Sequence, residues 1–399
     1  MVEVKVESFF SENIKAALKN DPPGLWAPVM PDNCIRLSSG YPEPALVPVE
    51  QLREAVAGLL EEEHDLPLHY LGSPKIVKLT EKIQKRLAER GIHVSKEELL
   101  ITSGACQAID LIARVLIDDE TFIVVESPTY MEALEIFKNY THNIISIPVD
   151  EHGLQTEQLE KLLEERRRKG LALPRFLYTI LTFQNPTGTT MSAERRKHVL
   201  ELAANYNFLI LEDDAYGELG FDESPLPLKA MDKEGLVIHV GSLSKIVAPG
   251  LRIGWIAGAS ELISAFAWFK KDLDHPFAQA TMAVFLEKTN EKERFQLLRD
   301  TYHNKRDVMV SALEQFLPES VSWIVPKGGY FVWVKIPSVD TSLLLNRALS
   351  EGVSFIPGKH FFLNQKDGTE FLRLSFSYAN KKDIVKGIKK LGYLLKETI

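Results

Sequence analysis

The sequence contains few cysteines: Cys34 and Cys106 are the only two among 399 residues. Two distant cysteines cannot build a disulfide framework and do not form the CxxC pair of many metal sites, so we expect no metal centre. A long apolar run is also missing, because the longest, residues 253–269, is interrupted by Glu261 and is short for a bilayer span. Residues 1–15 lack the apolar core of a signal peptide. We therefore expect a cytoplasmic protein with no membrane partner.

The sequence also has no excess of basic residues. Lys and Arg number 47 against 55 Asp and Glu, which gives a formal net charge of −8 at pH 7. A negative chain is a poor general binder of phosphate backbones, so we expect no nucleic-acid partner. The hydrophobic fraction of 45% is ordinary for a globular protein that buries a large core.

Short apolar segments alternate with amphipathic ones through the middle of the chain, and this alternation indicates an α/β fold. Such strands are typical of a mostly parallel sheet lying between helices. N-cap signals at Thr156 and Ser192 precede two of the amphipathic segments, and further helices are expected over residues 49–63 and 76–90. The predicted sheet is seven-stranded, with strands at Leu99–Thr102, Phe122–Val125, Ile144–Val149, Arg175–Leu181, Phe208–Leu211, Leu236–Val240 and Ile253–Ala257.

The pattern changes after about residue 290, where we expect a smaller α+β domain. The expected order is a long helix over 291–316, strands at 321–325 and 330–336, a helix capped by Asp340, strands near 353–356 and 371–376, and a basic helix from Lys381. Prolines interrupt any long element in the first 45 residues. We predict a large domain at 46–289 and a small domain formed by 1–45 together with 290–399.

The segment from Gly241 to Trp255 places a lysine between two apolar strands. Lys245 follows two serines and precedes a Pro-Gly turn and Arg252. Apolar surroundings would desolvate the ammonium group and lower its pKa. A lysine so placed acts as an amine nucleophile toward a carbonyl group, or as a base. By itself, the segment fits a loop lysine beside a core strand equally well.

Other predicted strands also end in polar, turn-rich segments, and ligands of parallel sheets gather at such ends. Ser103-Gly104-Ala105 precede a helix from about Cys106, which makes an anion cradle from backbone N–H groups. Tyr130 could stack on a planar ring, and Asn185, held extended by the following proline, could direct its amide into a cleft. Each feature alone also fits a plain turn or a packed side chain.

Three consecutive acids, Glu212-Asp213-Asp214, follow another apolar strand. Their burial is costly unless a positive group faces one of them, and a solvated loop is the simpler alternative. Taken together, however, the strand ends suit one ligand class, a phosphorylated pyridine aldehyde. Its aldehyde needs the amine of Lys245 and its ring nitrogen needs an anion. Its phosphate needs donors, which are available at Ser103, Gly104, Ala105, Ser242, Ser244 and Arg252.

In these motifs the chain resembles the class I/II pyridoxal-phosphate-dependent aminotransferases of fold type I. The most specific motifs are Ser242-Leu243-Ser244-Lys245 with Arg252, Asn185-Pro186-Thr187-Gly188, and Asp213-Asp214-Ala215-Tyr216. The resemblance covers nearly the whole chain, from Ser39-Gly40-Tyr41-Pro42 to Leu372-Arg373-Leu374-Ser375-Phe376. It is greatest to the branch that contains 2-aminoadipate and kynurenine aminotransferases.

The resemblance implies the cofactor pyridoxal 5′-phosphate and a role for each site residue. Lys245 would form a Schiff base with the cofactor and then move the proton of the substrate. Asp213 would pair with the ring nitrogen, and Arg373 would bind the substrate α-carboxylate beside Gly40. Further contacts are implied for Ser103, Gly104, Ala105, Ser242, Ser244 and Arg252 at the phosphate, Tyr130 at the ring face, and Asn185 and Tyr216 at the ring oxygen, with Asn185 also beside the substrate. Tyr70 would reach the phosphate of the neighbouring subunit, which implies a homodimer with shared active sites.

The implied reaction moves an amino group from an α-amino acid to a 2-oxo acid, with 2-oxoglutarate as the expected acceptor. Two alternatives remain: another reaction of the same cofactor (β-elimination, racemisation or a specialised biosynthetic step), or a ligand-sensing domain without turnover. The second alternative is disfavoured, because such regulators carry a winged-helix domain ahead of the motif at residues 39–44. Ala105 and Cys106 depart from the family, replacing residues that often offer phosphate-binding side chains. Arg36 could bind a distal carboxylate, but no motif indicates the amino-acid donor.

Overall fold

The central element of the fold is a mixed sheet of eight strands, ordered β2-β9-β8-β7-β6-β3-β4-β5. This computed structural model describes residues 5–11, 14, 17–27, 29–70, 72–222, 224–270 and 275–398. The strands are β2 (Leu99–Thr102), β3 (Ile123–Ser127), β4 (Ile144–Asp150), β5 (Gly153–Leu154), β6 (Phe176–Thr179), β7 (Leu209–Asp213), β8 (Val237–Ser242) and β9 (Gly254–Ala257).

All seven expected strands occur in this sheet, within a few residues of their expected ends. The predicted count was one too low, because β5 pairs antiparallel with β4 after a tight turn. A strand of two residues has too little alternation to be recognised in a sequence.

The strand directions bring the polar strand ends together. β2 and β8 both pair antiparallel with β9, so β2 runs parallel to β8. The neighbours β8, β7, β6, β3 and β4 are parallel throughout. Six of the eight strands, all but β9 and β5, therefore end at the same edge of the sheet. In sheets of this kind the ligand lies outside that edge.

Helices cover both faces of the sheet and bury its apolar side chains. α4 (Ala105–Leu116), α5 (Met131–Lys138) and α9 (Ser260–Phe269) pack on one face, where Phe137 and Phe266 are fully buried. α6 (Thr156–Arg168) and α7 (Ala193–Tyr206) cover the other face through residues such as Leu163 and Leu202. Because both faces of the sheet are buried, the strands are nearly continuous apolar runs in the sequence.

The two predicted N-caps had different outcomes. Ser192 caps α7 and accepts a hydrogen bond from the backbone N–H of Arg195. The prediction of Thr156 as an N-cap was wrong, because Thr156 is the first residue of α6 and Gln155 occupies the cap position. Its hydroxyl instead lies 2.9 Å from Nδ1 of His198 on α7, so the side chain is used between helices rather than at the helix end.

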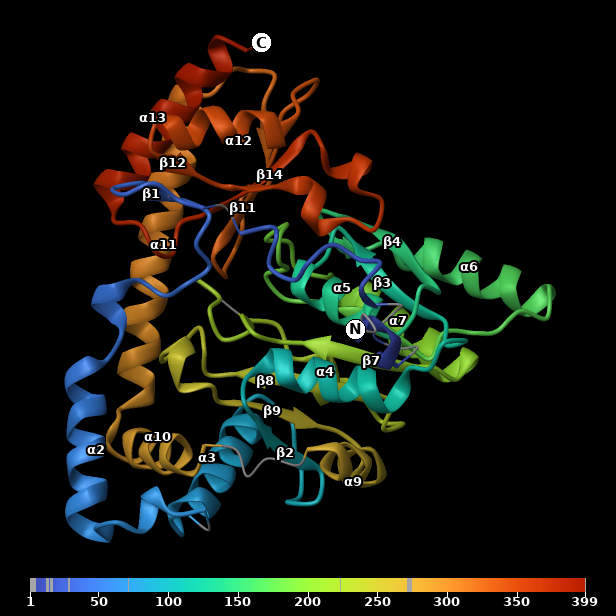
Figure 1. Ribbon diagram of the computed structural model, residues 1–399, viewed down its shortest axis with the longest axis vertical. Coiled ribbons are helices and arrows are strands. Elements are labelled where there is room, and N and C mark those ends of the chain that lie inside the picture. The colour runs from blue at the N-terminus through green and yellow to red at the C-terminus, as the bar shows by residue number, and fades with distance from the viewer. Residues whose placement is uncertain are drawn as a thin grey trace.

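A second sheet of four antiparallel strands, ordered β10-β11-β14-β13, follows late in the chain. Its strands are β10 (Ser322–Trp323), β11 (Phe331–Lys335), β13 (Ile356–Pro357) and β14 (Phe371–Ser375). Helices α11 (Glu291–Phe316), α12 (Thr341–Ser350) and α13 (Lys381–Lys396) accompany it. Figure 1 shows α12 and α13 at one end of the molecule, with α11 running from there toward α10. Asp340 caps α12, as expected, by accepting from the N–H of Ser342.

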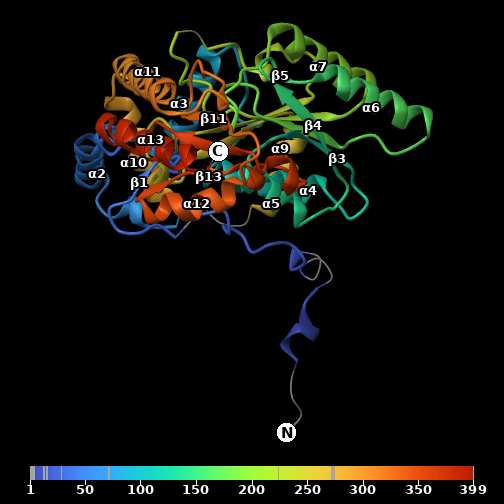
Figure 2. The same cartoon turned by 90° about the horizontal axis from the view of Figure 1, so that it is seen from above.

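The first part of the chain joins both regions. β1 (Ile35–Arg36) pairs parallel with β12 (Val353–Ser354), while α2 (Val49–Glu63) and α3 (Lys75–Glu89) pack against α10 (Pro276–Lys288). Figure 2 shows the blue N-terminal segment, with the 3₁₀ turn η1 (Val6–Phe9), extending away from the rest of the molecule. The short elements are η2 (Pro44–Leu46), η3 (Leu66–Leu68), α8 (Leu228–Met231), η4 (Pro249–Leu251), η5 (Gly358–Phe361) and η6 (Gln365–Gly368). The division into domains at residues 45 and 290 stays a prediction.

The longest apolar run of the sequence, residues 253–269, contains β9 and α9. Within the described ranges, no helix combines the length and the apolar character needed to cross a membrane.

Candidate active site

A cavity of about 350 Å³ opens at the edge of the large sheet where the parallel strands end. Strand ends of the large sheet, the loop at residues 38–41 and the second sheet all contribute to its walls. Eleven of the predicted site residues line this cavity: Gly40, Ala105, Tyr130, Asn185, Asp213, Tyr216, Ser242, Ser244, Lys245, Arg252 and Arg373. The fold therefore assembles residues that are more than 300 positions apart in the sequence.

Lys245 lies in the turn after β8, with its amine directed into the cavity. Nζ donates a hydrogen bond to the carbonyl oxygen of Gly40 at 2.9 Å, and it lies 5.7 Å from the centre of the Tyr216 ring. Burial lowers the pKa of the ammonium group to about 8. Near neutral pH a useful fraction of this amine is therefore unprotonated, as a nucleophile or base must be.

Asp213 is the last residue of β7 and has one oxygen without a partner. Its Oδ2 accepts a hydrogen bond from the hydroxyl of Tyr178 at 2.8 Å, whereas the buried Oδ1 has no partner within the described structure. Burial raises the pKa of this carboxyl to about 6, against the lowering effect of Tyr178. An unpaired buried carboxylate oxygen that lines a cavity suits a cationic N–H donor.

The turn after β2 and the turn after β8 meet at one end of the cavity. Arg252 donates from Nη2 to the carbonyl oxygen of Ser103 at 2.9 Å. Gly104 has a backbone φ of +89°, which favours glycine, and an added Cβ would lie against the same Nη2 atom. The hydroxyls of Ser242 and Ser244 are 2.9 Å apart and both line the cavity. Two hydroxyls and a guanidinium group beside the start of α4 form a suitable phosphate site.

Arg373 comes from β14 of the second sheet and reaches the opposite part of the cavity. Its Nη1 donates to Oδ1 of Asn185 at 2.9 Å and its Nη2 donates to the carbonyl of Ser38 at 3.0 Å. Nε has no partner in the described structure, and the guanidinium carbon lies 4.1 Å from the centre of the Phe331 ring. Burial lowers the pKa of Arg373 to about 10, which still leaves it positive at neutral pH. A planar cation so held can bind a carboxylate.

Tyr130 and Tyr216 supply aromatic faces and hydroxyls to the cavity. Tyr130 precedes α5 and donates its hydroxyl to Glu132, while the thiol of Cys106 donates to the same oxygen at 3.2 Å. Tyr216 lies edge-on to Phe331, with ring centres 5.6 Å apart. Burial raises the pKa of both tyrosines, so they are protonated donors at neutral pH.

Three predicted residues do not line the cavity. Ser103 accepts a hydrogen bond from Arg252 through its backbone carbonyl, and Gly104 lies next to the guanidinium group of Arg252. Tyr70 is 87% exposed and is not part of the cavity wall.

Sequence reasoning missed Tyr178 and Glu132. The register of β6 with β7 would have found Tyr178, because it pairs with Leu211 and so shares the face of Asp213. Glu132 could have been recognised as a neighbour of the Tyr130 side chain, since it follows Tyr130 by two residues at the start of a helix. The apolar wall formed by Trp26, Met131, Phe331 and Ile356 had no such signal.

The residues present fit the cofactor that the resemblance implies. Lys245 offers an amine of lowered pKa for an aldehyde, and Asp213 offers an unpaired oxygen for a protonated ring nitrogen. Arg252 and the two serines offer donors to a phosphate. Within the described part of the chain, no cluster of three or more His, Cys, Asp or Glu side chains is arranged to hold a metal ion.

The chain is similar to known aminotransferases in both sequence and structure. A family model described as "Aminotransferase class I and II" matches residues 32–391. The aromatic-amino-acid aminotransferase 1 of Thermococcus litoralis is 38% identical over 98% of this chain and 95% of its own length. The crystal structure of the multiple substrate aminotransferase from Thermococcus profundus superposes with a TM-score of 0.89, at 38% identity over 99% of both chains. The α-aminoadipate aminotransferase of Thermus thermophilus, solved with N-(5′-phosphopyridoxyl)-L-leucine, gives a TM-score of 0.88 at 31% identity over 99% of both chains.

Proposed function

Because this chain belongs to the class I and II aminotransferase family, we propose a specific role for each residue of its cavity. Members of this family depend on pyridoxal 5′-phosphate and move amino groups between an amino acid and a 2-oxo acid. The cofactor supplies an aldehyde that captures an amino group and a ring that withdraws electrons from the substrate Cα. The protein supplies the binding groups, the orientation and the movement of protons.

Lys245 is the proposed catalytic amine and base. Its neutral form would supply the amine that holds the cofactor aldehyde, and with substrate bound it would take the proton of the substrate Cα. The lowered pKa, about 8, supports this role because the amine needs no strong base to deprotonate it. The hydrogen bond to Gly40 holds Nζ on the substrate side of the cavity.

Asp213 and the phosphate donors hold the cofactor in this proposal. Oδ1 of Asp213 would accept the N–H of the ring and would favour a protonated ring nitrogen. Ser242, Ser244 and Arg252 donate to the phosphate, assisted by the backbone at Ser103, Gly104 and Ala105. Tyr130 would stack on the ring, and Asn185 and Tyr216 would hold the ring oxygen.

Arg373 orients the substrate. It binds the α-carboxylate through two parallel N–H groups, with Asn185 and the backbone of Gly40 beside it. The proposed amino acceptor is 2-oxoglutarate. Arg36, which lines the cavity on the same side as residues 38–41, supports this choice because it offers a cation to a distal carboxylate.

The proposed assembly is a homodimer with shared active sites in the cytoplasm. Tyr70 is 87% exposed here, as expected of a side chain that completes the phosphate site of a second copy. Val6 and Phe9 on the extended N-terminal segment are 65% and 78% exposed, and apolar residues so placed suit a contact with another subunit. Light scattering of the purified protein at twice the mass of one chain, 45.1 kDa, is the expected result. We also propose the domain division at residues 45 and 290, which separates the two sheets.

One observation carries the proposed roles: the amine of Lys245, the unpaired Oδ1 of Asp213 and the unpaired Nε of Arg373 occur in the walls of one cavity. The test mixes the loaded protein with a panel of amino acids and then with 2-oxoglutarate, while the cofactor spectrum and the products are followed. We expect conversion to pyridoxamine phosphate with release of an oxo acid, and reversal by 2-oxoglutarate. Release of ammonia or pyruvate without pyridoxamine would contradict transamination.

A further inference from the structure

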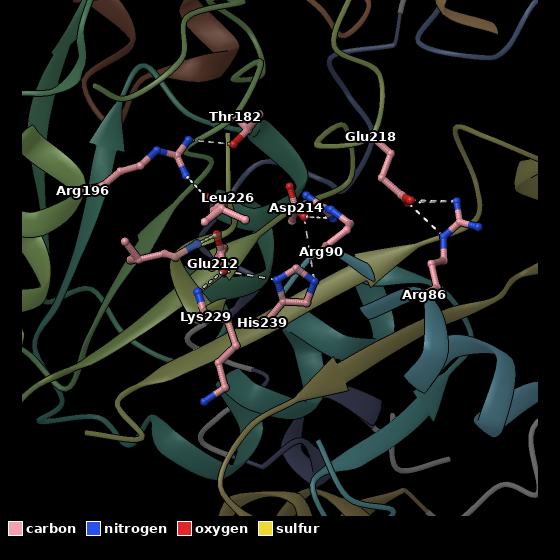
Figure 3. Close-up of polar contacts among 11 residues, drawn as sticks. Arg86, Arg90, Thr182, Arg196, Glu212, Asp214, Glu218, Leu226, Lys229 and His239 are labelled. Carbon is pink, nitrogen blue, oxygen red and sulfur yellow. Dashed lines mark hydrogen bonds and ion pairs between the residues drawn. The ribbon is translucent and has the colours of Figure 1, made fainter. Parts of the chain in front are cut away.

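A second polar cluster contains the two acids that flank Asp213 in the sequence, and Figure 3 shows Glu212 and Asp214 on either side of His239. The register of β7 with β8 pairs Glu212 with His239 and Asp213 with Val240. Since side chains alternate between the two faces of a strand, Asp213 faces the cavity, while Glu212 and Asp214 share the opposite face with His239. The three consecutive acids of the sequence are thus divided between two environments.

His239 lies between the two acids of the far face and is fully buried. Its Nδ1 is 3.2 Å from Oε2 of Glu212. Its Nε2 is 3.9 Å from Oδ2 of Asp214 and has no hydrogen-bond partner among the residues that the structure describes. The carboxylate of Glu212 also accepts the backbone N–H groups of Leu228 and Lys229. An ionised carboxylate only accepts, so Nδ1 of His239 must carry a proton.

The cations around this cluster are mostly engaged elsewhere. Arg90, which follows α3, forms an ion pair with Asp214. Arg196 on α7 donates to Thr182 Oγ1 and to backbone carbonyls instead of to an acid. The amine of Lys229 on α8 pairs with Asp232 at 3.0 Å. Arg86 on α3 pairs with Glu218 and Glu291. Among the described residues, Asp214 is therefore the one acid of 212–214 that forms an ion pair with a guanidinium group, and His239 is the ring that faces both Glu212 and Asp214.

We propose that His239 is a positioning residue for the cofactor, because it carries a second proton between Glu212 and Asp214. Its positive charge keeps Asp213 ionised, so that the proton shared by Asp213 and the ring nitrogen of the cofactor stays on the nitrogen. The inference rests on the proposed cofactor site. The unpartnered Nε2 beside Asp214 is the place for this second proton, because a lone pair there would face a carboxylate.

The direction of the effect follows from the charges. The negative charge of Asp214 raises the pKa of Asp213, and the positive charge of His239 lowers it. A cation behind the carboxylate therefore disfavours a proton on Asp213 and favours one on the ring, which is the protonation state that makes the ring an electron sink.

The test uses the full protein loaded with pyridoxal phosphate labelled with ¹⁵N in the ring. In the wild type at neutral pH, we expect the ¹⁵N resonance of a protonated ring. His239→Gln keeps an N–H donor for Glu212 but cannot carry the charge, so its resonance should move toward that of a neutral pyridine. Adding Asp214→Asn removes the second acid, and the resonance should return toward the wild-type position. Lys229→Gln, which removes a cation that pairs with Asp232, is the matched control and should cause no shift.

An unchanged resonance in folded, loaded His239→Gln would overturn the proposal and leave His239 a structural link between β7 and β8. If that variant does not fold, the ring nitrogens of His239 are observed in the wild type instead. Two protonated nitrogens at neutral pH support the proposal, and a neutral ring overturns it. Wild-type protein that does not bind pyridoxal phosphate through Lys245 would contradict the proposed function itself, so the two failures are distinguishable.

Discussion

Tyr178 donates a hydrogen bond to Oδ2 of Asp213 at 2.8 Å, which orients the carboxyl group and leaves Oδ1 unpaired at the cavity. Both residues are buried, and they come from adjacent strands of the large sheet. The contact separates two functions within one carboxyl group: one oxygen is held by the protein, and the other is available to a ligand.

Tyr178→Phe should weaken cofactor binding. Hydrogen bonds to a charged group contribute roughly 1.5–3 kcal/mol, so the dissociation constant of pyridoxal phosphate should rise roughly 10- to 100-fold. Loss of this donor also raises the pKa of Asp213, because the Tyr178 hydrogen bond lowers it. The measurement is a fluorescence titration of the cofactor-free protein. Tyr140→Phe is the matched control, since Tyr140 donates to Asp110 on α4 at 2.9 Å, and equal affinities for the two variants would contradict the prediction.

The covalent capture of the cofactor by Lys245 should depend on pH. Burial lowers the pKa of this amine from 10.5 to about 8, and only its neutral form attacks an aldehyde. The capture rate of the cofactor-free protein should therefore rise about tenfold per pH unit below pH 8 and level off above it. Stopped-flow absorbance between pH 6 and 10 follows the reaction. A rate still rising at pH 10 would mean that the amine is not desolvated, and Lys245→Ala should show no covalent capture at any pH.

Arg373→Lys should reduce turnover and leave cofactor binding intact. Lysine keeps the charge but loses the planar pair of N–H groups that matches a carboxylate. We expect kcat/KM for amino acids to fall roughly 10- to 100-fold, as expected for the loss of a charge-assisted hydrogen bond. The titration with pyridoxal phosphate alone should change little, because Arg373 contacts Asn185 and Ser38 rather than Asp213 or the phosphate donors Ser242, Ser244 and Arg252. Normal kcat/KM would exclude Arg373 as the substrate anchor.

Glu126 should make the stability of the protein depend on pH. Its carboxyl is buried among Thr179, Ile180 and Gln184, and burial raises its pKa from 4.5 to about 7. A raised folded-state pKa means that the folded protein binds the proton more tightly than the unfolded chain does. The contribution to stability is therefore complete below pH 4.5 and is lost as the pH rises through 7.

Glu126→Gln should remove this loss. An amide oxygen can still accept from Ile180 and Gln184, while the amide N–H₂ faces the hydroxyl of Thr179. Relative to the wild type, the variant should gain up to about 3 kcal/mol between pH 5 and pH 7.5, by the usual conversion of a pKa shift into free energy. Thermal unfolding of the cofactor-free proteins across this range measures the difference. Glu165→Gln, at an exposed ion pair with Lys169, is the control, and a constant difference across the pH range would contradict the prediction.

Much of the fold could be predicted because its strands are short, apolar and bounded by turns. The seven predicted strands and the helices after residue 290 occur close to where the pattern placed them. β5 was not predicted, because a strand of two residues is too short to show an alternation of apolar and polar residues. Thr156 has the composition of an N-cap but serves a contact with His198, which is a tertiary preference that local sequence does not encode.

The sequence by itself determined which chemical groups the site contains. A lysine between apolar strands and a run of acids after a strand indicate an amine and an anion, and the family resemblance implies that Arg373 binds a carboxylate. These are properties of residue type and position along the chain.

Only the tertiary structure decided how the acids divide their roles. Strand alternation turns Asp213 to the cavity and Glu212 and Asp214 to His239, and the partners that make this division stable come from β6, β8 and the end of α3. The protonation of a buried carboxyl depends on charges and donors within a few ångströms, and those neighbours are remote in the sequence. The cost of burying three adjacent acids is therefore offset by contacts that exist only in the folded chain.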